Sequence, residues 1–250
     1  MISRYSMQWL WLGLTLILTT AVSTYSQTPT FSGKVTDQNT GLGIANVAVV
    51  AQGNQTGTRV AITDVQGNYT ISMGANNNIK LRAYRTNFVF NPAQVSFISV
   101  GAFLDGPHQL DFSGAALPFP ILIFAQAPFL LTEDDSLKAL SVDSVFLKRD
   151  PFPLLDNNYF GADKRTRIKL LLVDLDLFSG ETLSIVTAEA IDQLQIPHNL
   201  PVEDLRKVPG VPWMTQLTVM LPSNLVVPGQ LTVSVTLRGQ TSNSATIRVQ

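Results

Sequence analysis

Asp174 and Asp176 are the residues whose type and spacing come nearest to a catalytic arrangement. They lie two positions apart in a strongly apolar run, Arg167 to Leu177, that predicts a β-strand. Residues two apart on a strand share a face about 7 Å from each other, within the span of the carboxylate pairs that hydrolyse glycosidic bonds. Paired aspartates are also common on the polar face of a strand without activity. Three nearby basic residues could neutralise them: Arg165, Arg167 and Lys169. We therefore predict no catalytic residue.

Potential metal ligands are few and scattered along the chain. The two histidines, His108 and His198, stand apart from each other beside proline, and there is no cysteine, so no zinc ligand set is present. The acidic and amide residues at 133–135 and 156–158 lack the spacing of a calcium-binding loop and fit a solvated loop better. Neither a nucleophile elbow nor a phosphate-binding glycine loop occurs. The sequence predicts no metal and no cofactor.

Aromatic residues offer a different kind of site, because a saccharide binds to the apolar face of an exposed ring. Tyr84 falls on the polar phase of its predicted strand together with Lys80 and Arg82, which makes it the first candidate for a ligand-binding residue. Trp213, expected in the loop before a strand, is the second. Tyr159 and Phe160 are the third. The same face could bind a protein, for which Tyr, Trp and Arg are usual anchors. We favour packing roles instead, with Tyr84 covering an edge strand and Trp213 closing the end of a sandwich.

Composition and charge narrow the class of partner. The formal net charge of −1 gives no overall field that would attract nucleic acid or anionic lipid. The lack of cysteine excludes disulfides, thiol catalysis and lipid attachment through an N-terminal cysteine. Stability must therefore come from ordinary apolar cores.

The first residues are typical of a secretory signal. Arg4 is the only charge before Lys34, and the run from Trp9 to Ala21 is apolar apart from Gly and Thr. An uncleaved membrane anchor is the alternative, although the run is short against the roughly 20 residues that a span needs. We expect a cleaved signal peptide at residues 1–27, no membrane span after cleavage, and a periplasmic or secreted protein.

The rest of the chain has the pattern of an all-β protein. Short alternating runs are separated by Pro, Gly and Asn, and no long helical period occurs. We predict two immunoglobulin-like or transthyretin-like β-sandwiches in tandem after the signal peptide, at residues 28–114 and 129–250, with 115–128 as a linker or first strand. The expected strands are 31–35, 44–49, 59–63, 69–73, 79–84, 95–98, 110–112, 139–147, 167–177, 182–190, 216–221 and 230–237, followed by a closing hairpin at 241–249.

Five segments of the first half carry a family resemblance. Thr63 to Ile71 (TDVQGNYTI) predicts a turn in which Asp64 bonds its own backbone and Gly67 adopts positive φ, thirty residues after Gly33 to Asp37 (GKVTD). The other segments are 41–47 (GLGIANV), 111–114 (DFSG) and 86–93 (TNFVFNPA), where Asn87 replaces a usual glycine. Residues 29–114 thus resemble the carboxypeptidase regulatory-like domain. The resemblance implies a transthyretin-like or collagen-adhesin B-type sandwich that connects or displays other domains and seldom performs chemistry.

The second half carries a weaker resemblance. Residues 241–249 place a Ser-Asn-Ser turn between two alternating strands, similar to the last hairpin of IPT/TIG domains. Residues 144–152 and 165–172 are similar to a C-terminal domain of exported acidobacterial proteins. The resemblance implies an immunoglobulin-like sandwich at 129–250 and no particular activity.

Together these features predict an exported, non-enzymatic binding or scaffolding protein of the bacterial cell envelope or secreted fraction. Its partner is then an envelope or extracellular protein, or a polysaccharide, and not nucleic acid. Two alternatives stay open: a carbohydrate-binding module with a starch-binding-like sandwich, and a cryptic glycoside hydrolase. Exposed coplanar aromatics would favour the first, and carboxylates converging in a deep pocket would favour the second.

Overall fold

The computed structural model describes residues 29–54, 56–74, 76–100, 107–117, 127–134, 136–156, 162–223, 225 and 228–250. The predicted signal peptide at 1–27 lies outside these residues, as do Tyr159, Phe160 and most of the predicted linker. Within the described part of the chain, no helix is both long enough and apolar enough to cross a bilayer.

Strands from the first half of the chain form two sheets. One sheet has the order β4-β1-β9-β6, with β8 also paired to β1, and comprises β1 (Thr30–Asp37), β4 (Asn68–Ser72), β6 (Phe88–Asn91), β8 (His108–Gln109) and β9 (Phe112–Ala116). The other has the order β3-β2-β5-β7 and comprises β2 (Ala48–Gly53), β3 (Gly57–Ile62), β5 (Asn76–Tyr84) and β7 (Val95–Val100). β1 runs parallel to β8 and β9, and the remaining pairs are antiparallel.

A core of alternating apolar residues fills the space between these sheets. Phe31 and Val35 of β1 point inward and are completely buried, while Lys34 between them is exposed. Val49 of β2 and Leu81 of β5 meet them from the facing sheet in one apolar cluster. Period-two alternation therefore produces a β-sandwich.

The predicted turn at Asp64 to Gly67 forms as expected. Asp64 Oδ1 accepts hydrogen bonds from the backbone N–H groups of Gln66 and Asn68, at 2.9 and 2.8 Å. Gly67 has φ of 82° and its carbonyl accepts from the Val35 N–H at 2.8 Å. The turn thus joins β3 to β4 and also attaches the hairpin to β1.

Strands from the second half form two further sheets. One has the order β10-β12-β16-β15, with β11 paired to β12, and comprises β10 (Phe129–Leu130), β11 (Ser141–Asp143), β12 (Arg167–Val173), β15 (Val202–Val208) and β16 (Val211–Met220). The other has the order β14-β13-β17-β18, with β19 paired to β17, and comprises β13 (Val186–Ile191), β14 (Pro197–Leu200), β17 (Gln230–Leu237), β18 (Gln240–Thr241) and β19 (Ala245–Arg248). A short 3-10 helix, η2 (Leu183–Ile185), precedes β13.

Several predicted strands of this half are shorter than expected. The run predicted at 139–147 is a strand only at β11, because Asp143 Oδ1 accepts from the N–H groups of Val145 and Phe146, at 2.8 and 2.6 Å, and turns the chain. The run predicted at 182–190 begins as η2. β17 has the predicted bounds, with its alternate residues Leu231, Val233, Val235 and Leu237 buried in the second core.

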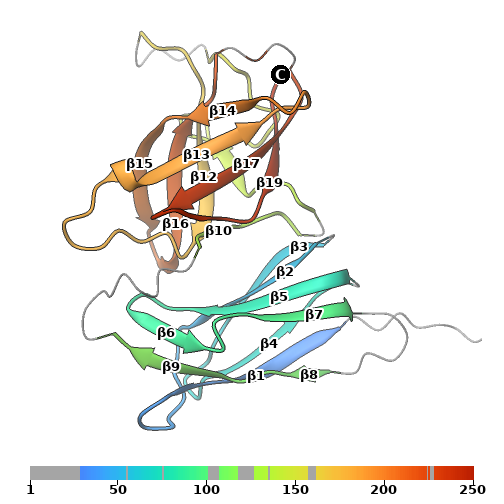
Figure 1. Ribbon diagram of the computed structural model, residues 1–250, viewed down its shortest axis with the longest axis vertical. Coiled ribbons are helices and arrows are strands. Elements are labelled where there is room, and N and C mark those ends of the chain that lie inside the picture. The colour runs from blue at the N-terminus through green and yellow to red at the C-terminus, as the bar shows by residue number, and fades with distance from the viewer. Residues whose placement is uncertain are drawn as a thin grey trace, which may run out of the picture.

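The predicted all-β fold with two sandwiches in tandem is confirmed. Figure 1 shows the sandwiches stacked along the long axis of the molecule, with the sheet of β3, β2, β5 and β7 nearer to the second sandwich than its partner sheet. Part of the outer face of this sheet therefore meets protein rather than solvent, and most of the predicted site residues lie on that face.

Candidate functional site

Three predicted ligand-binding residues lie on the outer face of β5. Ile79, Leu81 and Ala83 alternate inward. Lys80 is exposed, whereas Arg82 is half-buried and Tyr84 is only 8 % exposed. β5 is flanked by β2 and β7, so Tyr84 does not lie on an edge strand. The Tyr84 ring is packed, as favoured, but the predicted edge-strand position is wrong, because the ring lies on an inner strand beneath the second sandwich. A ligand-binding role for these residues stays a prediction.

An apolar cluster, here called the interface cluster, joins the two sandwiches. Its buried members are Ala48, Val50 and Tyr84 from the first sandwich and Phe129, Leu131 and Val173 from the second, with Val60, Leu140, Leu171, Trp213 and Met214 packed around them. Trp213 lies within β16, not in the loop predicted before it. The cluster removes apolar side chains of both sandwiches from water, which favours a fixed contact.

The sequence carries a signal for this contact that the strand predictions did not use. β2 contains the continuous apolar run Ala48 to Ala51, and β12 contains the run Leu170 to Val173. A strand with one solvated face alternates apolar and polar residues, whereas a strand buried on both faces is continuously apolar. In each run, alternate residues belong to the sandwich core and to the interface cluster.

Hydrogen bonds and ion pairs border one side of the interface cluster. The Tyr84 hydroxyl donates to Asp176 Oδ2, and Lys207 forms an ion pair with the same carboxylate. Lys207 Nζ also donates to the Tyr84 hydroxyl at 3.2 Å and lies 5.5 Å from the centre of its ring. Burial, followed by the Asp176 charge, raises the pKa of Tyr84 well above its ordinary value. Tyr84 is therefore a neutral hydrogen-bonding group at the contact.

Arg82 and Asp174 form a second polar contact between the sandwiches. Arg82 Nη2 lies 3.5 Å from Asp174 Oδ2, and both terminal nitrogens donate to the Ala127 carbonyl, at 3.2 and 3.1 Å. Burial raises the pKa of Asp174 to about 7, although the Arg82 charge opposes the effect. Burial likewise lowers the pKa of Arg82, against the attraction of Asp174. Removing both charges of such a pair from water costs free energy, and the attraction between them offsets that cost only when the two groups are well oriented.

The two aspartates are not arranged as predicted. β12 ends at Val173, and Asp174 has φ of 61°, so regular strand alternation stops before Asp176. Two of the three basic residues that could neutralise them pair elsewhere. Arg165 pairs with Asp163 at 2.7 Å and Arg167 pairs with Glu203 at 2.9 Å. The charges come instead from other strands: Arg82 on β5 and Lys207 on β15.

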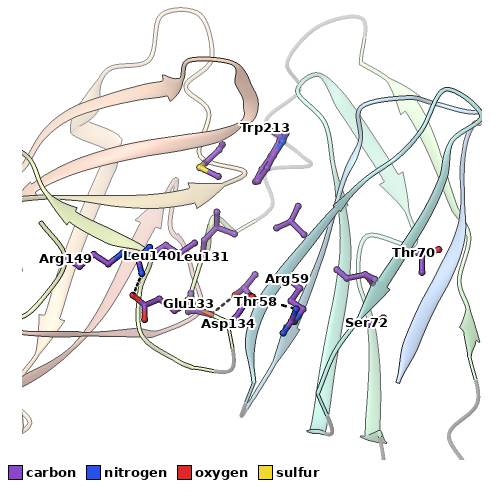
Figure 2. A pocket seen from close by; sticks show the side chains of 14 residues that line it. Thr58, Arg59, Thr70, Ser72, Leu131, Glu133, Asp134, Leu140, Arg149 and Trp213 are labelled. Atoms are coloured by element: carbon purple, nitrogen blue, oxygen red, sulfur yellow. Dashed lines mark hydrogen bonds and ion pairs between the residues drawn. The ribbon is translucent and has the colours of Figure 1, made fainter. Parts of the chain in front are cut away.

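A groove of about 690 Å³ lies beside the interface cluster. It is bounded on one side by the edge strands β3 and β4 and on the other by residues 131–134 and β16. In Figure 2, Arg59 lies on the first sandwich and Trp213 on the second, and both side chains border the groove. At its base the Thr58 and Thr132 hydroxyls share a hydrogen bond of 2.9 Å.

The histidines have packing and hydrogen-bonding roles. His108 stacks on Phe31, with ring centres 5.1 Å apart. His198 Nε2 lies 3.0 Å from Asp192 Oδ2, and both residues are buried. Among the residues that the structure describes, no group of three or more His, Cys, Asp or Glu side chains is placed to hold a metal ion.

No protein-family profile matches the chain, and no curated protein matches it in sequence. Solved structures give distant likenesses. BcpA, the major pilin subunit of Bacillus cereus, is 8 % identical, with 90 % of this chain and 70 % of that chain covered and a TM-score of 0.29. The major pilin SpaD of Corynebacterium diphtheriae is 7 % identical, with 90 % and 65 % covered and a TM-score of 0.31. A DUF3823 family protein of Bacteroides ovatus is 11 % identical, with 89 % and 100 % covered and a TM-score of 0.25. Because these scores are low, they identify no activity, ligand or partner for this chain.

Proposed function

We propose that the chain is a non-catalytic scaffolding module of an exported protein, in which two β-sandwiches form one rigid unit. The interface cluster is the observation that carries the proposal. Ala48 of the first sandwich and Val173 of the second are 0 and 2 % exposed, as deeply buried as residues of the two cores. Domains joined by a small polar contact move relative to each other, whereas an apolar contact opposes such motion.

Polar contacts on two sides of the cluster favour a single orientation. Arg82 and Tyr84 meet Asp174 and Asp176 on one side. Thr58 meets Thr132 on the other, where Arg59 also lies 3.7 Å from Asp134. Apolar burial supplies attraction without direction, and hydrogen bonds supply direction. A fixed spacing between two modules is the property that a connecting or displaying function needs.

The residues once considered for catalysis support the same proposal. Asp174 and Asp176 are each bonded to a basic residue of another strand and contribute to the contact between the sandwiches. A hydrolase acid and base need to reach a substrate instead. We therefore propose no enzymatic activity, and an envelope or extracellular protein or a polysaccharide as the partner.

Domain boundaries and family membership are part of this proposal. We assign residues 28–114 to a carboxypeptidase regulatory-like domain and 129–250 to an IPT/TIG-like domain, with residues 1–27 as the export signal. The Asp64 to Gly67 turn supports the first assignment, and Asn87, with φ of 64° where glycine is usual, fits the expected turn. The hairpin predicted at 241–249 does not form, because β18 and β19 both pair with β17 and not with each other. The second assignment therefore rests on the sequence resemblance alone, although Asn243 between these strands bonds both backbone groups of Leu130, at 2.8 and 3.0 Å.

A distance measurement between the sandwiches tests the rigid unit. Because the chain contains no cysteine, spin labels can be attached to two introduced cysteines without removing native ones. Val65→Cys and Leu194→Cys place one label on each sandwich, at side chains that are 76 and 58 % exposed. Electron–electron double resonance should give one narrow distance distribution. A Leu155→Cys and Leu194→Cys pair within the second sandwich provides the reference width. A clearly broader distribution for the pair between sandwiches would contradict the proposal.

A further inference from the structure

The outer edge of β4 carries main-chain groups that have no partner. β4 is the end strand of its sheet and, among the described residues, pairs only with β1. The Met73 N–H donates to the Pro29 carbonyl at 3.0 Å, so these two residues form a bonded pair of the antiparallel ladder. Because bonded and non-bonded pairs alternate in such a ladder, the N–H and C=O groups of Thr70 and Ser72 point away from β1. These groups make no hydrogen bond within the described part of the chain.

The turn before β4 sets one limit of this open stretch. Asn68 also points its main-chain groups outward, but its N–H donates to Asp64 Oδ1 at 2.8 Å and its carbonyl accepts from the Asp64 N–H at 3.0 Å. The side chains of Thr70 and Ser72 lie on the outer face of the sheet, where Ser72 Oγ is 3.2 Å from Thr30 Oγ1. The edge is thus open through its main chain and not through its hydroxyl groups.

β4 also lacks the features that protect other sheet edges of this molecule. Its sequence, NYTIS, contains no charge and no proline, and its register with β1 has no bulge. The edge strand β15 has four charged residues among seven and a bulge, and the edge strand β14 begins with Pro197. The β3 edge is covered, since a Cβ at Gly57 would lie 2.3 Å from the Ser136 carbonyl. Such features prevent an edge from pairing with another chain, so β4 is open to pairing.

The surroundings of the edge favour a single strand over a second copy of the chain. The groove beside the interface cluster reaches Thr70 and Ser72, and residues 131–134 bound it on its far side. A second copy that paired its own β4 here would be related by a two-fold axis, which would bring its 131–134 segment toward the same segment of the first copy. An extended peptide brings no such segment.

The charges along the groove are paired. Arg59 lies 3.7 Å from Asp134, and Arg149 lies 3.4 Å from Glu133. An anionic peptide would compete with these carboxylates for the arginines, and a cationic peptide would compete with the arginines for the carboxylates. The pairing therefore favours a segment without net charge.

We propose that the β4 edge binds an extended peptide segment of a partner protein by strand addition, and that this segment has no net charge. Its main chain pairs with Thr70 and Ser72 and continues the sheet of β4, β1, β9 and β6. Side chains of an added strand alternate between the outer face and the face that covers the core, so apolar residues suit every second position. This site goes beyond the scaffolding function. It does not depend on the fixed arrangement of the sandwiches, because β4 and β1 both belong to the first one.

Amide NMR spectra of the full chain, labelled with nitrogen-15, give a direct test. The probe is the peptide Lys-Thr-Val-Thr-Val-Thr-Glu, acetylated and amidated at its ends, which alternates valine with threonine and has no net charge. It should shift the Thr70 and Ser72 amide signals saturably, with Kd below about 1 mM, and slow the hydrogen exchange of both amides. No saturable shift at either amide would overturn the inference.

Two variants at one position separate main-chain pairing from side-chain recognition. Thr70→Pro removes an outward N–H and leaves the β1 ladder intact, a change that edge strands tolerate. It should weaken binding at least about tenfold, measured at the Ser72 amide. Thr70→Val keeps the main-chain groups and should leave the affinity unchanged. Equal affinity of the two variants would refute strand addition.

Methylated peptides give a test that needs no variant of the protein. N-methylation of the threonines and N-methylation of the valines each block the donors along one edge of the peptide. One form should lose binding and the other should keep it, and equal affinity of the two forms would contradict the proposal. A concentration-dependent dimer that Thr70→Pro abolishes, together with no peptide binding, would assign the edge to a second copy instead. A broad spin-label distance with intact peptide binding would overturn only the rigid scaffold.

Discussion

The hydroxyl of Tyr84 donates a hydrogen bond to the carboxylate of Asp176, 92 positions later in the chain, across the contact between the two sandwiches. Lys207 touches both groups, as a donor to the tyrosine oxygen at 3.2 Å and as the ion-pair partner of the aspartate. These contacts join the end of β5, β15 and the segment after β12 at one side of the interface cluster. Two residues considered for ligand binding and for catalysis thus meet as a structural pair.

We expect Tyr84→Phe to loosen this contact. The substitution keeps the ring but removes the hydroxyl from Asp176 and Lys207. A hydrogen bond to a charged group contributes about 2 kcal/mol, so the free energy of unfolding should fall by about that amount in urea titrations. The spin-label distance between the sandwiches should broaden as well.

Tyr69→Phe is the matched control for this change. The Tyr69 hydroxyl donates to the Leu110 carbonyl at 2.6 Å, entirely within the first sandwich. Its loss should cost about 1 kcal/mol and leave the spin-label distance narrow. Equal distance distributions in both variants would show that Tyr84 does not fix the orientation of the sandwiches.

Asp174 should make stability depend on pH near neutrality. Burial raises its folded-state pKa to about 7 against the attraction of Arg82, whereas an unfolded aspartate titrates near about 4. The folded state therefore binds the proton more tightly. The resulting stabilisation is complete below about pH 4 and is lost as the pH rises through about 7. We expect the unfolding temperature to fall between about pH 5 and about pH 8, and Asp174→Asn to flatten that fall.

Other charges facing Asp174 are Asp176, Lys207 and Arg238, and they are the same in both proteins. The difference between wild type and Asp174→Asn therefore isolates this carboxyl. Asp163→Asn is the control, because hydrogen bonds from Arg165 lower the pKa of Asp163 and move its titration below this window. Identical pH slopes for wild type and Asp174→Asn would rule out the assigned titration.

Local pattern predicted several of the longer strands that have one face on a core. Ile79, Leu81 and Ala83 alternate with polar residues, and the predicted strand ends with β5 at Tyr84. The pattern failed where side-chain bonds end a strand early. Asp143 turns the chain after β11, although the residues that follow are apolar. β14 and β15 were not predicted, and β15 has a weak pattern because its residues are only partly buried or exposed.

The site could be predicted only in part, because it depends on contacts between distant segments. The polar phase of β5 was identified, yet alternation cannot say whether that face meets water or another sandwich. The packing role favoured for Tyr84 was therefore assigned to an edge strand and not to the contact between the sandwiches. The partners Asp176 and Lys207 are set by the packing of the two sandwiches, which no local spacing encodes. The continuous apolar runs of β2 and β12 were the sequence feature that indicated burial of these strands on both faces.

Gly67 should resist substitution far more than another glycine with similar backbone geometry. Gly67 and Gly180 have φ of 82° and 89°, so alanine is strained at both. A Cβ at Gly67 would lie 2.3 Å from the Val35 carbonyl, whereas nothing lies within 4 Å of one at Gly180. Gly180→Ala should cost about 1 kcal/mol of unfolding free energy, and Gly67→Ala about 3 kcal/mol or more. Similar losses in urea titrations would argue against the close packing of this turn on β1.

Thr63 should contribute to stability through two buried hydrogen bonds that hold the start of β2. Its hydroxyl accepts from the Val47 N–H at 2.9 Å and donates to the Ile44 carbonyl at 2.7 Å. Thr63→Val keeps the shape but leaves both backbone groups without this partner, which should lower the unfolding free energy by about 3 kcal/mol. Thr70→Val makes the same chemical change at an exposed position and should stay within about 0.5 kcal/mol of wild type. Equal stability of the two variants in urea would show that the Thr63 bonds contribute little to the first sandwich.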